Sequence, residues 1–438
     1  MKAPKFFFVF RKWEIIIILF FPVQVIFFSF IGKHPQFIES WYSEGLFKFL
    51  SFIIRTLTSW IPFPAGEVFL YFLVFFLVFR FVYSIVQLAR KQIGLIPFVL
   101  KPLITLLSWS SIVYFMFMVL WGLNYHREPL VSFEGVRSKN QDYESQDFER
   151  QDLEKQDFEK QDFERQDLEK QDFEKQDYER QDLEKQDLEK QEVSEGNIFS
   201  TTELIGLCEI LIKQSNDSRE QAIKNDNNMN MDDEDIIDQA YSGFHNIYVQ
   251  NKKLDYRTPS VKKIIFSNLF SYLGVGGIYN PFTGEANVNM DPPDFLLPAT
   301  VCHEMAHQAG IAPEDEANYV SYIVCKQHPN RFFQYSGILM AMRYAMGTLK
   351  SNNRNAYDEL LGQISEGVQN DLKENRKYWS RFKNPFEKYS DRIYDQYLKA
   401  NSQQAGIKSY SRMVKLLLYD YRNGEMSKER KGEWSKRR

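Results

Sequence analysis

The chain is poor in cysteine, and this scarcity excludes one class of protein. It has three cysteines, Cys208, Cys302 and Cys325, in 438 residues. An odd and small set does not form the disulfide framework of a small secreted domain. We expect Cys302, which directly precedes His303, to be buried packing and not a nucleophile.

An excess of positive charge is also lacking. The formal net charge is −4 at pH 7 and no basic fold motif is present, which excludes a nucleic-acid partner. The exception is the tail 423–438, which is cationic and is predicted to be disordered.

Charge is almost absent from three runs near the N-terminus, at about 13–31, 65–86 and 102–122. Each has close to the 20 or so apolar residues that span a hydrocarbon core. The first run has no small-residue cleavage site before Gly32, so we interpret it as a retained anchor. Residues 1–125 are therefore predicted to be a membrane module with three transmembrane helices, and 37–61 a helix at the membrane interface.

The placement of lysine and arginine predicts the orientation of this module. Cationic residues precede the first span and lie between the second and third: Lys2, Lys5, Arg11, Lys12, Arg90, Lys91 and Lys101. Because such loops tend to stay in the cytoplasm, three spans place the C-terminal region outside. We expect an integral, multi-pass membrane protein whose region after the third span is extracytoplasmic.

A low-complexity tract separates the membrane module from the rest of the chain. From Gln141 to Glu192 a five-residue unit repeats, Gln-Asp, an apolar residue, Glu, and Lys or Arg. Such a unit advances about 140° around a helix, so its apolar residues form no continuous stripe and build no core. Residues 126–196 are predicted to be a charged spacer.

The segment 197–422 is long enough for a domain of its own. Its pattern predicts an α+β, mainly helical fold, with β-type sequence at 261–270 and a short strand at 285–289. Helical spacing recurs in six further segments, 201–214, 236–249, 299–309, 330–349, 356–379 and 409–421.

The segment 299–309 contains His303-Glu304-Met305-Ala306-His307. Histidines four residues apart share one helix face, so both rings can bind one zinc ion. Glu304 can then reach the metal-bound water as the general base. A strand before such a helix is typical of zincin metallopeptidases, in which an edge strand holds an extended substrate.

Zinc needs a third protein ligand, and Gly310 allows the chain to turn back toward the helix. We favour Glu314 as this ligand, with Asn318 one turn later orienting a histidine; Glu316 is the alternative ligand. Alternatively, the acidic residues at 314–316 could bind no metal and serve only to stabilise the N-terminus of a helix. Candidate donors to an oxyanion are Tyr319, Tyr322, His328, Arg343 and Tyr410, whereas His34, His126 and His245 have no partner at metal-ligand spacing.

These residues carry a resemblance to a known family. The segments 121–125, 277–287, 303–308 and 314–318 together resemble the membrane-anchored bacterial family called domain of unknown function 3810. Residues 314–318 also look like the third-ligand helix of gluzincins, although the interval from His307 is shorter than in most of them. The resemblance implies a zincin-like HExxH metallopeptidase carried on three spans.

The function we expect is that of a membrane-bound zinc metalloendopeptidase with peptide or protein substrates. Two other classes remain as alternatives. One is a catalytically inactive, membrane-anchored scaffold or binding protein on a zincin fold, which would have no need for Glu304. The other is a transporter component, which the scarcity of ionisable residues within the spans disfavours. The sequence specifies neither the substrate nor the oligomeric state.

Overall fold

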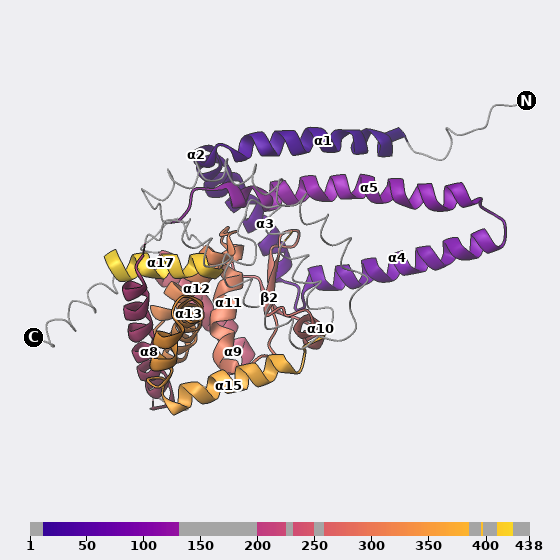
Figure 1. The fold of residues 1–438 in the computed structure, drawn as a ribbon. Helices are drawn as coiled ribbons and strands as arrows, with labels where there is room; N and C mark the ends of the chain where they lie inside the picture. The colour runs from indigo at the N-terminus through magenta and orange to yellow at the C-terminus, as the bar shows by residue number, and fades with distance from the viewer. Residues whose placement is uncertain are drawn as a thin grey trace, which may run out of the picture. The chain divides into compact units, whose positions relative to one another are not determined.

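The computed structural model describes residues 12–130, 199–224, 231–248, 258–384, 396 and 410–423, and within them the fold is mainly helical (Figure 1). The pentapeptide repeat and the basic tail lie outside these residues. Contacts divide the chain into two compact units, one made of Met1–Pro129 and Ile205–Arg438 and the other of Leu130–Leu204. All contacts described below belong to the first unit.

Among the described residues, three helices are long and apolar enough to cross a membrane, α1 (Lys12–Gly32), α4 (Ala65–Ala89) and α5 (Leu95–Leu120). The predicted third run, 102–122, begins too late, because α5 starts at Leu95 and continues through Pro102. Helices α1 and α5 run side by side (Figure 1). Gln24 Nε2 donates to Ser111 Oγ across their interface at 3.2 Å, the kind of polar contact that joins apolar helices.

The segment after α1 is helical, as expected for 37–61. It consists of α2 (Pro35–Phe37), the π-helix η2 (Ile38–Leu46) and α3 (Phe47–Ser59). The polarity of α3 is inverted relative to a soluble helix: Ser51 and Arg55 are buried, whereas Phe49 and Leu57 are exposed. The polar face of α3 thus packs against protein and its apolar face lies outward.

A three-stranded sheet lies next to these helices, with strands β1 (Val261–Lys263), β2 (Gly277–Asn280) and β3 (Glu285–Val288). The strand order is β1-β3-β2, with β1 parallel and β2 antiparallel to β3. Strand β3 confirms the strand expected at 285–289, whereas β2 was not predicted.

The β-type pattern at 261–270 was only half right. Strand β1 ends at Lys263, and α10 (Ser267–Tyr272) follows. The chain leaves the sheet because the N–H groups of Ile265 and Phe266 donate to the Glu67 carboxylate of α4, at 3.0 and 3.3 Å, and not to a neighbouring strand.

Helix α11 (Leu297–Gln308), the helix predicted at 299–309, packs against the sheet and against α9 (Asp233–Tyr248), α12 (Glu314–Lys326) and α13 (Arg331–Asn352). Further helices are α8 (Thr201–Lys224), α14 (Arg354–Leu361), α15 (Glu366–Ser380) and α17 (Tyr410–Asn423), with the 3₁₀ turns η3 (Gly122–His126) and η5 (Asp294–Leu296). The helix expected at 356–379 is interrupted, because the chain turns at Gly362 between α14 and α15. Cys302 and Cys325 are free and buried, which confirms the packing role expected for Cys302.

The start of α4 is fixed to the sheet by two carboxylates. Glu285 of β3 is fully buried and accepts hydrogen bonds from Ala65 N and Gly66 N, both at 2.9 Å. Glu67 of α4 in turn accepts hydrogen bonds from the two backbone N–H groups that precede α10. A helix N-terminus favours a negative charge, so this contact stabilises α4 where it leaves the sheet.

Candidate metal site

Two helices that meet at a tight reversal form the site. Helix α11 carries His303 and His307, and Gly310, with φ of +95°, follows its end. This left-handed conformation is open to glycine at little cost. The chain then runs back through Pro313, and α12 begins at Glu314. The reversal therefore returns a carboxylate to the histidine-bearing face of α11.

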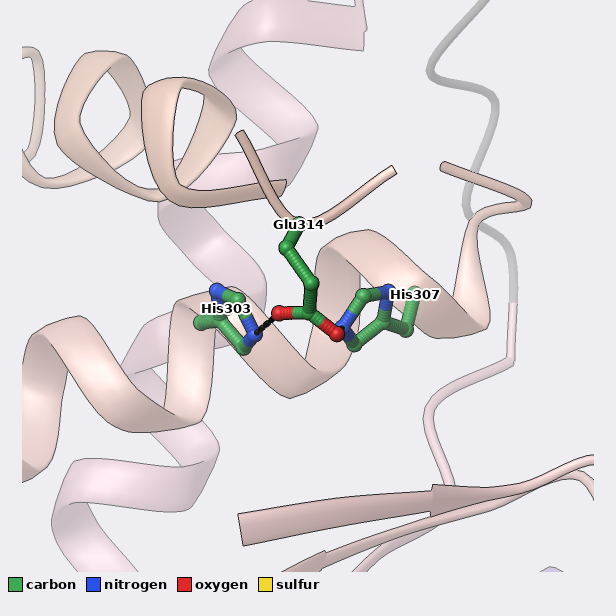
Figure 2. Close-up of side chains that lie close together, drawn as sticks. All are labelled: His303, His307 and Glu314. Atoms are coloured by element: carbon green, nitrogen blue, oxygen red, sulfur yellow. Dashed lines mark ion pairs between the residues drawn. The ribbon is translucent and has the colours of Figure 1, made fainter. Parts of the chain in front are cut away.

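Glu314 lies between the two imidazoles (Figure 2). Its Oε2 is 3.2 Å from His303 Nε2 and its Oε1 is 3.5 Å from His307 Nε2. One ligand atom from each of the three residues lies within 4.8 Å of the other two. Two imidazole nitrogens and one carboxylate oxygen are a donor set that suits zinc and leaves a coordination position open. These residues thus fit a metal ion.

The alternative ligand, Glu316, is buried but is not part of this group of ligand atoms. Asn318 is also buried, and its Nδ2 has no hydrogen-bond partner among the described residues. Its role in orienting a histidine stays a prediction. For His307 the Ile311 carbonyl is the partner, because His307 Nδ1 donates to it at 2.7 Å. This bond turns His307 Nε2 toward Glu314.

Electrostatics couple His307 to Glu314. Burial disfavours the imidazolium, but the Glu314 carboxylate outweighs burial and, with Glu304 and the Ile311 carbonyl, raises the pKa of His307 to about 9. Burial likewise acts to raise the pKa of Glu314, yet the two histidines hold it well below its usual range. Without a metal, the pair is therefore charged at neutral pH, and a bound cation would replace the proton on His307.

Glu304 is a second buried carboxylate beside this group. It is 3% exposed, and its Oε2 has no hydrogen-bond partner among the described residues. Burial raises its pKa, against the opposing charges of His303 and His307. Strand β2 passes close to it: a Cβ at Gly277 would lie only 2.5 Å from Glu304 Oε1. The glycine therefore allows the backbone of an edge strand to approach the carboxylate.

Residues from the N-terminal segment hold the reversal in place. Arg127 Nη1 donates to the Gly310 carbonyl at 3.0 Å, and the same guanidinium pairs with both oxygens of Glu39 at 2.9 Å. Arg55 Nη1 donates to the Gln308 carbonyl at 3.2 Å. Phe47 packs where a side chain at position 310 would stand. Residues within or next to the predicted membrane module thus shape the site.

Trp121, directly after α5, belongs to the surroundings of the site. It is buried and forms part of a core cluster with Phe47 and Tyr279. Its ring stands edge-on to His307, with centroids 5.9 Å apart. The signal that could have found it is the segment 121–125 in the family resemblance, which joins it to the residues of the site.

The residues that were expected to donate to an oxyanion have different surroundings from one another. His328 is engaged through Nε2 with Ser242 and the Gln239 carbonyl, both at 2.9 Å. Tyr322 is fully buried, Arg343 is exposed, and the side chain of Tyr410 lies outside the described residues. His34 stacks edge-on with Phe30 and is absent from the metal-binding group. A donor to an oxyanion therefore stays a prediction.

Fold and site together define a mainly helical protein that joins three membrane-compatible helices to a histidine–carboxylate cluster. The family model described as "Protein of unknown function (DUF3810)" matches residues 42–195 and 173–418. The chain belongs to this family. No curated protein matches the chain, and no solved structure does.

Removal of Arg127 should destabilise the protein strongly. In Arg127→Met, Glu39 loses the guanidinium that pairs with both its oxygens, and the Gly310 carbonyl loses a donor. A broken buried ion pair costs about 3–5 kcal/mol. The free energy of unfolding, measured by denaturant titration in mild detergent, should fall by this amount, whereas Arg376→Met at an exposed position of α15 should change it by less than about 0.5 kcal/mol.

Adding Glu39→Gln to Arg127→Met should recover part of the loss, because the unpaired charge is then removed. Equal unfolding free energies for Arg127→Met and Arg376→Met would contradict the structural role of this ion pair.

Metal binding should release a proton. The pKa of His307 is about 9, so its ring is protonated at neutral pH, whereas a metal ion needs the neutral ring. The apparent affinity for Zn²⁺ should rise about tenfold per pH unit from about pH 6 to about pH 8 and level off above about pH 9. Calorimetry in buffers of different ionisation enthalpy measures the proton directly, and an affinity independent of pH would refute the prediction.

Proposed function

We propose that this protein is a membrane-bound zinc metallopeptidase with a zincin-like fold. One observation carries the proposal. Glu304 is a buried carboxylate whose Oε2 has no hydrogen-bond partner among the described residues, and it lies beside a group of two histidines and a glutamate that fits a metal ion. An unpaired buried carboxylate is costly, so its presence favours a role toward a bound water or substrate.

His303, His307 and Glu314 would hold the zinc ion. When bound, zinc would polarise the scissile carbonyl and make a coordinated water more acidic. The Ile311 carbonyl keeps the Nδ1 proton of His307, so its Nε2 is the nitrogen left for the metal. Trp121 covers the edge of the same ring and helps to exclude bulk water from it.

Glu304 is proposed as the general base. Its raised pKa brings it closer to neutrality, where a carboxylate accepts a proton more readily than an ordinary glutamate does. It would take the proton from the attacking water and deliver it to the leaving amine.

The substrate strand is assigned to β2. The expected edge strand was the one just before the motif, but that strand is β3, which lies between β1 and β2. Strand β2 is an edge of the sheet, and its Gly277 contacts Glu304. An extended peptide added to β2 by main-chain hydrogen bonds would therefore pass the base.

We further propose that α1, α4 and α5 cross the membrane, which makes the protein multi-pass and the site extracytoplasmic. Along α4 the side chains from Val68 to Val82 are almost all apolar, and most are exposed. So much apolar surface on one helix is compatible with lipid and not with water. The side of the membrane follows from the lysine and arginine placement alone.

Replacing the base should abolish hydrolysis and leave metal binding. Full-length protein in detergent, with or without Glu304→Gln, would be assayed for zinc per chain and for cleavage of a mixed peptide library. We expect one zinc per chain in both, and cleavage reduced about 10²–10⁴-fold in the variant. Glu359→Gln, at an exposed position of α14, is the matched control.

Zinc without cleavage in the wild-type protein would favour the inactive scaffold. Absence of zinc from all three proteins would overturn the assignment of the site.

The approach of β2 to Glu304 gives a second test, with a neighbouring glycine as control. A Cβ at Gly277 would overlap Glu304, whereas a Cβ at Gly276 meets only Thr300 at an ordinary 3.7 Å. Gly277→Ala should therefore displace the carboxylate and lower kcat/KM by about tenfold or more, since even a small displacement of a reacting group is costly. Gly276→Ala should retain activity, and both should bind zinc. Equal activities would show that β2 does not position Glu304.

A further inference from the structure

An exposed apolar surface surrounds α10. Five residues at or next to this helix are between 47% and 55% exposed: Ile265, Phe266, Leu269, Tyr272 and Leu273. We call these five the α10 surface. The chain from Ile264 to Gly284 contains no charged residue. A contiguous apolar surface without charge on a water-exposed domain marks a site of interaction.

The α10 surface lies beside the beginning of α4. Glu67 of α4 binds the N–H groups of Ile265 and Phe266, and the Phe266 ring stands edge-on to Tyr71 with centroids 5.2 Å apart. Tyr71 is one turn beyond Glu67, which places it about 6 Å further along the helix axis. Phe266 is therefore level with the first exposed apolar turn of α4.

A second exposed apolar segment lies at the same end of α4. Trp60, which is 85% exposed, and Phe63 precede the start of α4 in the turn after α3. Lys262 Nζ donates to the Ile61 carbonyl and so joins this turn to β1. Tryptophan is enriched where a protein crosses from water into lipid.

We propose that the α10 surface enters the interfacial layer of the bilayer that α4 crosses. The inference rests on the membrane placement given under the proposed function. The proposal depends on the α10 surface being continuous with the apolar surface of α4. Phe266 contacts α4 within its first apolar turns, and the exposed Trp60 and Phe63 lie at the same end of α4. Lipid is the occupant that also covers α4, whereas a protein partner would need to cover both a span and α10.

This placement has a consequence for the substrate. Only Gly274, Val275 and Gly276 separate the α10 surface from β2, where Gly277 contacts Glu304 and Ile278 is exposed. The proposed substrate strand therefore lies next to the membrane surface. The substrate class that fits is a peptide segment directly next to a membrane anchor.

The insertion can be tested by the depth of a fluorescent label. Cys208, Cys302 and Cys325 are buried, so a single introduced cysteine can be labelled selectively on the full-length protein. Leu269→Cys would carry an NBD group in phosphatidylcholine and phosphatidylglycerol vesicles with nitroxide-bearing lipids. Phe69→Cys on the exposed side of α4 is the positive control, and Asp217→Cys on the exposed side of α8 is the negative control.

We expect lipid nitroxides to quench the label at 269 at least about half as strongly as the label at 69, and the label at 217 hardly at all. Quenching at 269 equal to that at 217 would overturn the proposal. A blue-shifted but unquenched label at 269 would also overturn it, because protein and not lipid would then cover the surface. An unquenched label at 69 would instead overturn the membrane placement of α4. The measurement needs neither metal nor substrate, so its result is independent of the peptidase assignment.

The substrate class has its own test. A peptide that the protein cleaves would be offered either free in solution or attached to a lipid anchor in the same vesicles. Wild type should cleave the anchored peptide at least about tenfold faster, and Leu269→Glu should reduce this preference without changing cleavage of the free peptide. Equal rates for both peptides would overturn the substrate class and leave the peptidase function intact.

Discussion

The reversal at Gly310 is the constraint on which the site depends. It returns Glu314 to the face of α11 that carries His303 and His307, and its next residue, Ile311, orients His307. A loop of this kind has few contacts of its own and would otherwise be mobile. Arg127 fixes it through the Gly310 carbonyl, and Glu39 fixes Arg127. The ligand geometry therefore relies on an ion pair supplied from outside the motif.

The N-terminal segment therefore contributes to the structure of the site. Its contacts with the rest of the protein are made by buried polar groups. Arg55 binds the Gln308 carbonyl and Arg127 the Gly310 carbonyl, Glu67 accepts from the backbone between β1 and α10, and Glu285 of β3 accepts from the start of α4. Buried groups of this kind lose more when a partner is removed than they gain when it is present. A fragment containing only 197–438 would expose several of them at once. Fold and site are thus shared between segments that the sequence assigns to different domains.

The sequence predicted what local patterns determine. The three apolar helices, the helix with the HExxH residues, strand β3 and the candidate ligand Glu314 all follow from periodicity or spacing. Long-range contacts were not accessible in this way. Arg127 stands at the start of a charged segment and resembles a solvated residue, and α10 has the composition of a strand until Glu67 takes its N–H groups. Strand β2 was missed because its glycine, required by Glu304, weakens the strand pattern.

The attachment of α4 has a mechanical consequence. A single transmembrane helix adapts to a thicker or thinner bilayer by tilting, at a modest cost. Helix α4 enters the sheet through Ala65, Gly66 and Glu67, each hydrogen-bonded to it or to the chain that follows it. If α4 spans the bilayer, it cannot tilt without tilting the sheet as well. Hydrophobic mismatch would then change the height and angle at which Glu304 faces the membrane, so lipid chain length becomes a variable of the site.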